Sequence, residues 1–222
     1  MPQPFRSGIA GVGTVVAGLV EALQQNADVI AQRAGRPIVI AKISARDRNR
    51  KRPVDVSKYE WVEAPESLAD DESLDAVVEL IGGASGVART LVEKALGNGR
   101  NVVTANKALL ANHGFGLAVL AEKNNAALMF EAAAAGSIPI IKALRESFSG
   151  NRVKSLYGIL NGTCNYIMTQ MRETNRNFME VLEEAQDMGY AEADPSFDVD
   201  GVDAGHKLVL LSSLAFGVKP DF

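Results

Sequence analysis

The sequence has little of what disulfide-bonded or zinc-binding proteins require. Its 222 residues contain one cysteine, Cys164, and two histidines, His113 and His206. A single cysteine cannot form an internal disulfide, and thiols are kept reduced in the cytoplasm. One cysteine and two distant histidines provide no zinc-ligand spacing. These scarcities favour a cytoplasmic protein.

Long apolar runs are also missing. The N-terminal residues have no apolar core of the kind that marks a signal peptide. The longest apolar stretches, 126–141 and 208–218, are too short or carry a charge, so no membrane span is expected. A net charge of -4 gives no general attraction to nucleic acid or to anionic membranes. The expected partners are therefore small molecules or further copies of the chain.

What is present is an alternation of strand and helix patterns over the first 130 residues. Helical periodicity begins at Thr14, with Val15, Leu19, Val20 and Leu23 expected on one face. Strands that are apolar throughout and separated by helices indicate a parallel sheet covered on both faces. We therefore predict a doubly wound α/β domain over residues 1–134. The predicted strands are 5–10, 37–43, 75–81, 101–104 and 126–131, and further helices are predicted at 84–96 and 115–124.

The pattern changes after residue 135, where Ala135-Gly-Ser-Ile-Pro139 supplies a break. Val153–Leu160 is a strand candidate, but helical patterns then dominate at 164–173, 178–188 and 201–216. A smaller α+β domain over residues 135–222 is expected. Since no flexible linker separates the halves, we expect them to pack around a ligand-binding cleft.

The segment Gly11-Val-Gly13-Thr-Val-Val16 follows the first strand and opens the first helix. This is the context of a Rossmann dinucleotide fingerprint, in which glycines let the backbone approach a pyrophosphate at a helix N-terminus. The third glycine of the fingerprint is replaced by Val16. The alternative interpretation is a glycine-rich turn without a ligand.

The residues that follow the second predicted strand indicate which cofactor would bind. An NAD site usually has an acid there to bind the ribose 2′-hydroxyl, whereas an NADP site tends to have an arginine. Here Arg46 follows the strand, and Arg48, Arg50 and Arg52 come soon after. This favours NADP over NAD, with a solvated basic loop as the alternative.

Two lysines and an acidic segment could supply chemistry. Lys107 lies just past a predicted strand end, although an isolated lysine there could be an ordinary surface residue. Asp203 and Lys207 are four residues apart and share a helix face. They are either an exposed ion pair or, because the buried-looking run Leu208–Leu211 follows, an acid–lysine pair that lines a cleft.

Two other hypotheses, a calcium loop and a nucleophilic cysteine, have less support. The spacing Asp198-x-Asp200-Gly lacks the alternating ligands and the closing glutamate of a calcium loop. Cys164 could be a nucleophile, as in aldehyde-oxidising dehydrogenases, but a small buried thiol is the better interpretation.

Several ordered motifs resemble homoserine dehydrogenases along essentially the whole chain. The most specific is Gly189-Tyr-Ala-Glu-x-Asp-Pro195 followed by Asp198-Val-x-Gly201-x-Asp203-x3-Lys207. The others are Glu79-Leu-Ile-Gly-Gly83, Val103-Thr-Ala-Asn-Lys-Ala-Leu109, Phe130-Glu-Ala132 with Gly136-Ser-Ile-Pro-Ile140, and Leu160-Asn-Gly-Thr-Cys-Asn-Tyr-Ile167.

The resemblance implies an oxidoreductase of threonine, methionine and isoleucine biosynthesis that interconverts L-aspartate 4-semialdehyde and L-homoserine with NADP or NAD. It implies Lys207 as proton donor, with Lys107 close to substrate and cofactor. It also implies a homodimer or homotetramer and a structural sodium ion. The implied substrate contacts are Glu192, Asp198 and Asp203; the cofactor contacts are Gly11, Gly13, Thr14, Val15, Arg46, Thr104, Lys107 and Gly189; the sodium ligands are Glu131, Ala134, Gly136 and Ile138.

The sequence departs from the family pattern in three places. Val16 replaces a glycine, and Cys164 stands where the family usually has threonine or serine. Family members also continue beyond the position of Phe222 and complete the substrate domain there. The resemblance therefore leaves two expectations, a dehydrogenase with an incomplete substrate domain or a truncated, non-catalytic dinucleotide-binding or regulatory relative.

Overall fold

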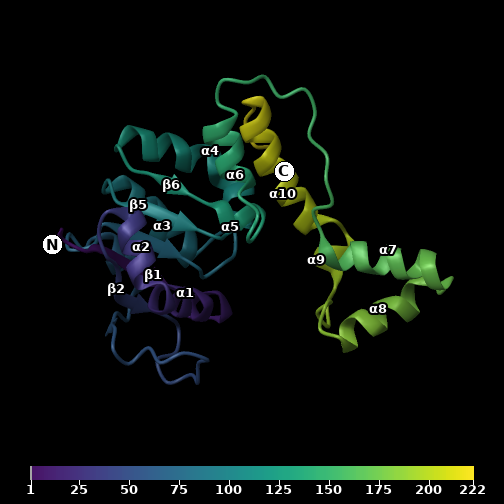
Figure 1. Cartoon of the computed structure of the whole chain (residues 1–222), viewed down its shortest axis with the longest axis horizontal. Coiled ribbons are helices and arrows are strands. Elements are labelled where there is room, and N and C mark those ends of the chain that lie inside the picture. The colour runs from purple at the N-terminus through teal and green to yellow at the C-terminus, as the bar shows by residue number, and fades with distance from the viewer. Residues whose placement is uncertain (1) are drawn as a thin grey trace. The chain divides into compact units, whose positions relative to one another are not determined.

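The computed structural model describes residues 2–222, which form two compact units that divide between Ile140 and Ile141 (Figure 1). The predicted domain boundary lies six residues earlier. Each unit has its own hydrophobic core. In the first unit, Ile9, Val16, Val20 and Ile43 are buried together. In the second, the buried cluster comprises Ile167, Val181, Leu182, Ala185 and Ala191.

The first unit is built on a six-stranded sheet in the order β3-β2-β1-β4-β5-β6, and every pairing is parallel. This order confirms the predicted doubly wound α/β fold. The strands are β1 (Phe5–Ala10), β2 (Ile38–Ser44), β3 (Glu60–Trp61), β4 (Ala76–Glu79), β5 (Asn101–Thr104) and β6 (Leu128–Met129).

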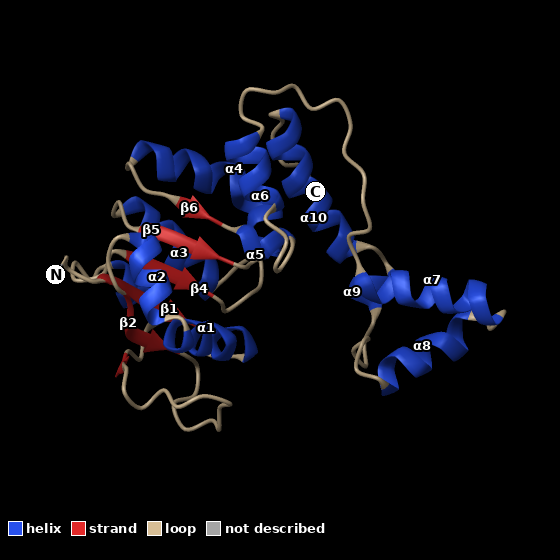
Figure 2. Cartoon of the chain, viewed as in Figure 1, coloured by secondary structure: helices blue, strands red, loops and turns tan. Residues whose placement is uncertain are grey.

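Helices cover both faces of this sheet (Figure 2). From β1 the chain proceeds outward to β2 and β3, then returns to β4 and proceeds the other way to β5 and β6. Right-handed crossovers in opposite directions place their helices on opposite faces. The helical segments are α1 (Thr14–Gln25), α2 (Ala27–Ala34), the 3-10 turn η1 (Pro65–Ala69), α3 (Val87–Gly97), α4 (Lys107–Lys123) and α5 (Glu131–Ala134). The short helix α6 (Ile140–Lys142) crosses the boundary between the two units.

The buried face of α1 differs from the prediction by one position. Val16 and Val20 are its buried residues, whereas Val15 is 61% exposed. Because α1 begins directly after Gly13, its second residue, Val15, projects outward and its third, Val16, faces the sheet. Val16 thus occupies the position of the missing fingerprint glycine as a core residue packed with Ile9 and Ile43.

The boundaries of α4 and β6 also differ from the prediction. The helix begins at Lys107, eight residues before the predicted start at Phe115, because the Asn106 side chain caps it by accepting a hydrogen bond from the amide of Leu109 (3.0 Å). The strand predicted over 126–131 is confined to Leu128–Met129.

Helices are the only regular secondary structure in the described residues of the second unit. Its helices α7 and α8 form a hairpin around the buried cluster, and α9 leads into α10 (Figure 1). In order, the helical segments are the π-helical turn η2 (Ala143–Ser147), α7 (Gly162–Thr174), α8 (Phe178–Asp187), α9 (Ser196–Val199) and α10 (Val202–Phe216).

Two expectations for this unit are wrong. Val153–Leu160 was expected to be a strand, but residues 152–161 have no regular secondary structure. A strand needs a hydrogen-bonded neighbour, and none pairs with this segment among residues 2–222. The run Leu208–Leu211 is only half-buried: Leu210 and Leu211 are buried, whereas Leu208 is 45% exposed, because packing covers one side of α10. In neither unit is a described helix both long and apolar enough to cross a bilayer.

Candidate functional site: a dinucleotide cleft and an acid–lysine cluster

The glycine loop lies at the point where the strand order reverses. The amide of Gly11 donates to the carbonyl of Ser44 at the end of β2 (2.8 Å), and the amide of Leu80 donates to Ala10 (2.8 Å). Gly11 has a φ of +91°, and a Cβ there would lie 2.4 Å from the carbonyl oxygen of Leu80. Only glycine fits between the two loops, so the first fingerprint position has a steric cause.

The N-terminus of α1 is suited to bind an anion. Gly13 is its N-cap, no side chain caps the helix, and its first turn contains no acidic residue. Nothing lies within 4 Å of the place where a Cβ on Gly13 would be. Uncapped amides at a helix start attract phosphate groups. The backbone at Gly13, Thr14 and Val15 therefore fits a pyrophosphate.

A cleft of about 640 Å³ opens beside this loop. Its size falls in the range of small-molecule sites. Arginines outnumber acids along its rim, so the cleft has a net positive lining that suits a phosphorylated ligand. Its basic residues are Arg46, Arg50 and Arg52, its acids are Asp47 and Glu63, and its apolar wall includes Pro65, Leu80, Ile81 and Val87.

A buried polar network joins the ends of β4 and β5. The fully buried Glu79 carboxylate accepts hydrogen bonds from the amides of Ile81 (2.8 Å) and Gly82 (3.0 Å) and from the Thr104 hydroxyl (2.6 Å). The Thr104 hydroxyl in turn accepts from the amide of Asn106 (2.9 Å). Thr104, expected to contact cofactor, is 1% exposed, and its side chain is already engaged in this network. The network sets the position of Lys107, the next residue along the chain.

The second unit brings Asp198, Asp203 and Lys207 together. The Lys207 ammonium lies 2.8 Å from the Asp203 carboxylate and donates to the carbonyl of Leu160 (2.9 Å). The Lys207 and Asp203 side chains are 21% and 7% exposed. Asn161 connects the acids, since its amide donates to Asp198 (2.7 Å) and to Asp203 (3.1 Å). The pair is therefore sheltered, not a freely solvated surface ion pair.

Cys164 lies beside these acids and is poorly suited to act as a nucleophile. Its thiol donates to the carbonyl of Asp198 (3.2 Å). Burial, together with the negative charges of Asp198 and Asp203, raises the pKa of the Cys164 thiol. The thiolate, the reactive form, is thereby disfavoured.

Glu192 and Gly189 lie on the segment that follows α8. Glu192 is exposed, and among the described residues its side chain makes no hydrogen bond with Asp198, Asp203 or Lys207. Gly189 has a φ of +75°, and its amide donates to Gln186 as α8 ends (2.9 Å). A helix that ends in this way requires a left-handed residue, which explains the glycine.

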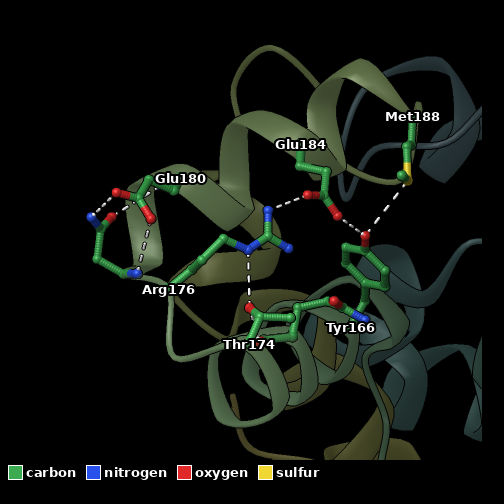
Figure 3. Close-up of polar contacts among 8 residues, drawn as sticks. Tyr166, Thr174, Arg176, Glu180, Glu184 and Met188 are labelled. Atoms are coloured by element: carbon green, nitrogen blue, oxygen red, sulfur yellow. Dashed lines mark hydrogen bonds and ion pairs between the residues drawn. The ribbon is translucent and has the colours of Figure 1, made fainter.

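A polar clamp holds the α7–α8 hairpin together (Figure 3). The Glu184 carboxylate accepts hydrogen bonds from both the Arg176 guanidinium and the Tyr166 hydroxyl. The Tyr166 ring packs edge-on against Tyr190, with ring centroids 5.1 Å apart, and the Thr163 hydroxyl donates to the carbonyl of Tyr190 (2.9 Å). The residues preceding Glu192 are thus anchored to α7.

The residues named for sodium lie at α5 and just after it. Glu131 begins this helix and Ala134 ends it, while Gly136 and Ile138 are exposed in the following turn, where Ser137 has a φ of +65°. Within residues 2–222, no three His, Cys, Asp or Glu side chains are grouped to hold a metal ion. A site there would depend on main-chain oxygens.

Asn161 and Glu79 carry structural roles that the sequence patterns did not assign. Asn161 was detectable in part, because asparagine just before a helix is a common N-cap. Asn161 directly precedes α7, and its side chain accepts from the amide of Cys164 (2.8 Å). Its second function, the bridge to Asp203, joins residues 42 apart in sequence and left no local signal.

The fold and the cleft define the class: the first unit is a Rossmann-type dinucleotide-binding domain. Two family models match the chain in succession, described as "Homoserine dehydrogenase, NAD binding domain" over residues 11–131 and "Homoserine dehydrogenase" over residues 139–222. Together these matches show that the chain belongs to the homoserine dehydrogenase family.

Individual relatives agree with this assignment. The chain is 49% identical to a homoserine dehydrogenase of Pseudomonas aeruginosa and 48% identical to one of Neisseria gonorrhoeae, with 99% of the chain and 50% of each relative covered. A crystal structure of a homoserine dehydrogenase from Thiobacillus denitrificans matches with a TM-score of 0.93 and 45% identity, over 99% of this chain and 50% of that one. A hyperthermophilic archaeal homoserine dehydrogenase in complex with NADPH matches with a TM-score of 0.84 and 28% identity, over 98% of this chain and 71% of that one. The chain thus spans about half the length of the curated relatives it matches.

Proposed function

We propose that the chain supplies the cofactor-binding and lysine-bearing parts of an enzyme that interconverts L-aspartate 4-semialdehyde and L-homoserine with NAD(P). The observation that carries this proposal is the sheltered Asp203–Lys207 pair, joined through Asn161 to Asp198, in a chain 49% identical to a homoserine dehydrogenase. The reaction would serve threonine, methionine and isoleucine biosynthesis in the cytoplasm.

A nicotinamide cofactor, when bound, supplies the hydride that reduces the aldehyde carbon and accepts it in the reverse direction. In reduction, the aldehyde oxygen gains a proton as the carbon gains the hydride. Lys207 is the proposed donor of that proton, because its ammonium is fixed by Asp203 and by the carbonyl of Leu160. Lys107 is proposed to lie near both substrate and cofactor.

The acids are proposed to bind the substrate's amino acid end. A substrate ammonium group is attracted by carboxylates, and Asp198, Asp203 and Glu192 provide three on neighbouring segments. Asp203 also pairs with Lys207, so one carboxylate would orient both the proton donor and the substrate.

NADP is the proposed cofactor in preference to NAD. Arg46 follows β2 and lines the cleft together with Arg50, where an NAD site would place an acid at the strand end. The archaeal relative bound to NADPH supports this choice. The pyrophosphate would lie on Gly11, Gly13, Thr14 and Val15, with Thr104, Lys107 and Gly189 as further contacts.

A structural sodium ion on main-chain oxygens of Glu131, Ala134, Gly136 and Ile138 belongs to the same proposal. So does assembly into a homodimer or homotetramer. Both follow from the family resemblance, and neither is needed for the chemistry assigned to Lys207.

The proposal is tested by replacing Lys207 with alanine. Lys207→Ala should reduce NADP-dependent homoserine oxidation by about 100-fold or more, since a positioned proton donor contributes about that much. Cofactor affinity, measured by calorimetry, should stay within about twofold, because Lys207 is not among the proposed cofactor contacts. Lys154, an exposed lysine of the same unit, provides the control Lys154→Ala, which should keep wild-type turnover.

Both the 222-residue chain and its natural full-length form should be assayed. Undiminished turnover in Lys207→Ala would refute the assigned role. Cofactor binding without any turnover, even in the full-length protein, would instead identify a non-catalytic relative of the same fold.

A further inference from the structure

The basic segment that follows β2 is Ala45–Arg52, referred to below as the arginine loop. It carries four arginines and one lysine within seven positions and has no regular secondary structure. Like charges this close repel one another, so a bare loop of this composition would spread into solvent. Specific contacts must therefore hold the arginine loop beside the cleft.

Arg52 is the residue that holds it. Its guanidinium donates to the carbonyls of Arg48 (2.9 Å), Arg50 (2.8 Å) and Asp47. These three acceptors are spread over four consecutive positions, and a planar guanidinium with several fixed donors can reach them together. Arg52 is also only partly exposed, unlike Arg46 and Arg50. Its two terminal nitrogens thus donate within the loop, whereas Nε is buried and has no hydrogen-bond partner among residues 2–222.

Trp61 fixes Arg52 in turn. The Arg52 guanidinium lies over the Trp61 ring, 5.3 Å from its centroid, and the Arg48 guanidinium lies 5.8 Å from the same ring. Trp61 belongs to β3 and pairs with Ile43 of β2, one residue before that strand ends. It also packs against the buried cluster around Ile9 and Ile43. The arginine loop is therefore connected to the rigid sheet through one aromatic ring.

We propose that Arg52, stacked on Trp61, is a positioning residue that sets the selection of NADP over NAD by fixing the arginine loop, while Arg46 and Arg50 make the phosphate contact. This inference rests on the proposed cofactor site and distinguishes, within that site, the residue that positions the loop from the residues that bind phosphate. The 2′-phosphate is the only group that distinguishes the two cofactors. A device that shapes only the arginine loop should therefore alter affinity for NADP and spare NAD.

Calorimetric titration of the chain with NADP+ and with NAD+ tests this distinction. Arg52→Ala should weaken NADP+ binding about tenfold, the scale of a lost charge-assisted hydrogen bond to phosphate, and leave the affinity for NAD+ within about twofold. Arg52→Lys keeps the charge but lacks the planar donor set, so it should weaken NADP+ binding nearly as much. Trp61→Leu changes no charge and should weaken NADP+ binding about threefold to tenfold.

Arg36 provides a matched control in the same unit. It also stacks on an aromatic ring, with its guanidinium 4.8 Å from the Phe5 centroid, but lies at the opposite end of β2 and does not line the cleft. Arg36→Ala should bind both cofactors as the wild type does. Trp61 is the sole tryptophan of the sequence, so its fluorescence emission should shift in both Arg52 variants and stay unchanged in Arg36→Ala.

The possible outcomes separate the two proposals. Wild-type NADP+ affinity in Arg52→Lys would show that charge alone suffices and would overturn the positioning role. An equal loss for NADP+ and NAD+ in Arg52→Ala would overturn it as well, because that result indicates a general defect of the domain. A wild-type chain that binds NAD+ more tightly than NADP+, or neither, would contradict the cofactor proposal itself.

Discussion

At the residue scale, the acid–lysine cluster depends on an amide. Asn161 is 9% exposed and donates to two carboxylates, Asp198 and Asp203, that would otherwise face each other beside a single lysine. The same side chain caps α7 through its carbonyl oxygen. One residue therefore starts a helix and holds two proposed substrate ligands in place.

Replacing Asn161 should lower the free energy of unfolding by more than the loss of a helix cap alone. We expect Asn161→Ala to lower the free energy of unfolding by roughly 2–4 kcal/mol, since it removes a cap and leaves two sheltered carboxylates short of a donor. Asn177, the N-cap of α8, has a capping box but no such bridge, so Asn177→Ala should cost about 1 kcal/mol. Urea denaturation of both variants measures the difference, and equal losses would show that the bridge contributes nothing.

At the scale of elements, the α7–α8 hairpin combines an apolar core with the clamp of Arg176, Glu184 and Tyr166. The hydrogen bond from Arg176, and next that from Tyr166, lowers the pKa of Glu184 below its ordinary value of 4.5. The hydrogen bond to Glu184 raises the pKa of Tyr166 in the complementary direction. The ionised carboxylate and the protonated phenol are thus the forms that stabilise the hairpin.

The clamp should make the hairpin's stability depend on pH. Because the folded pKa of Glu184 is depressed, its stabilising contribution is fully present above about pH 4.5 and is lost as the pH falls through the folded value. Glu184→Gln should therefore have a lower melting temperature than the wild type at pH 7. The difference in melting temperature, called the gap below, should narrow below pH 4.5. The exposed neighbour Glu183 supplies the control Glu183→Gln, for which we expect a small gap without this narrowing. A gap for Glu184→Gln that stays constant from pH 3 to pH 7 would contradict the assignment.

Most elements could be predicted because their signals are local. Apolar runs separated by helical periodicity indicated the parallel sheet, and the spacing of Asp203 and Lys207 placed them on one helix face. Contacts between distant segments leave no such pattern. Glu79 is predicted as one more residue of a strand, yet its carboxylate is bonded to Thr104, 25 residues further on. Nor does periodicity show that Trp61 lies under Arg52.

The prediction of a strand at Val153–Leu160 was wrong for the same reason, because strand formation also depends on contacts with a distant segment. Its composition suits a strand, but a strand also needs a partner, and β-propensity mainly measures the fit to such a partner. Within residues 2–222 this segment has none, so two of its apolar side chains remain in solvent, while Val153, Leu156 and Leu160 are only partly buried. Tyr157 is 93% exposed and Ile159 is 76% exposed.

At the scale of the whole molecule, this segment should be the point most open to proteolysis. Proteases cut extended, solvent-exposed backbone in preference to helices and strands. Brief chymotrypsin treatment of the 222-residue chain should cut first after Tyr157, where the chain has no regular structure and the side chain is almost fully exposed. Phe115, although half-exposed, lies within α4 and should resist. Mass spectrometry identifies the first fragments, and Tyr157→Ser should abolish them without changing the far-UV circular dichroism. Early cleavage within α4 instead would mean that the helices of the first unit open more readily than the segment that lacks a strand partner.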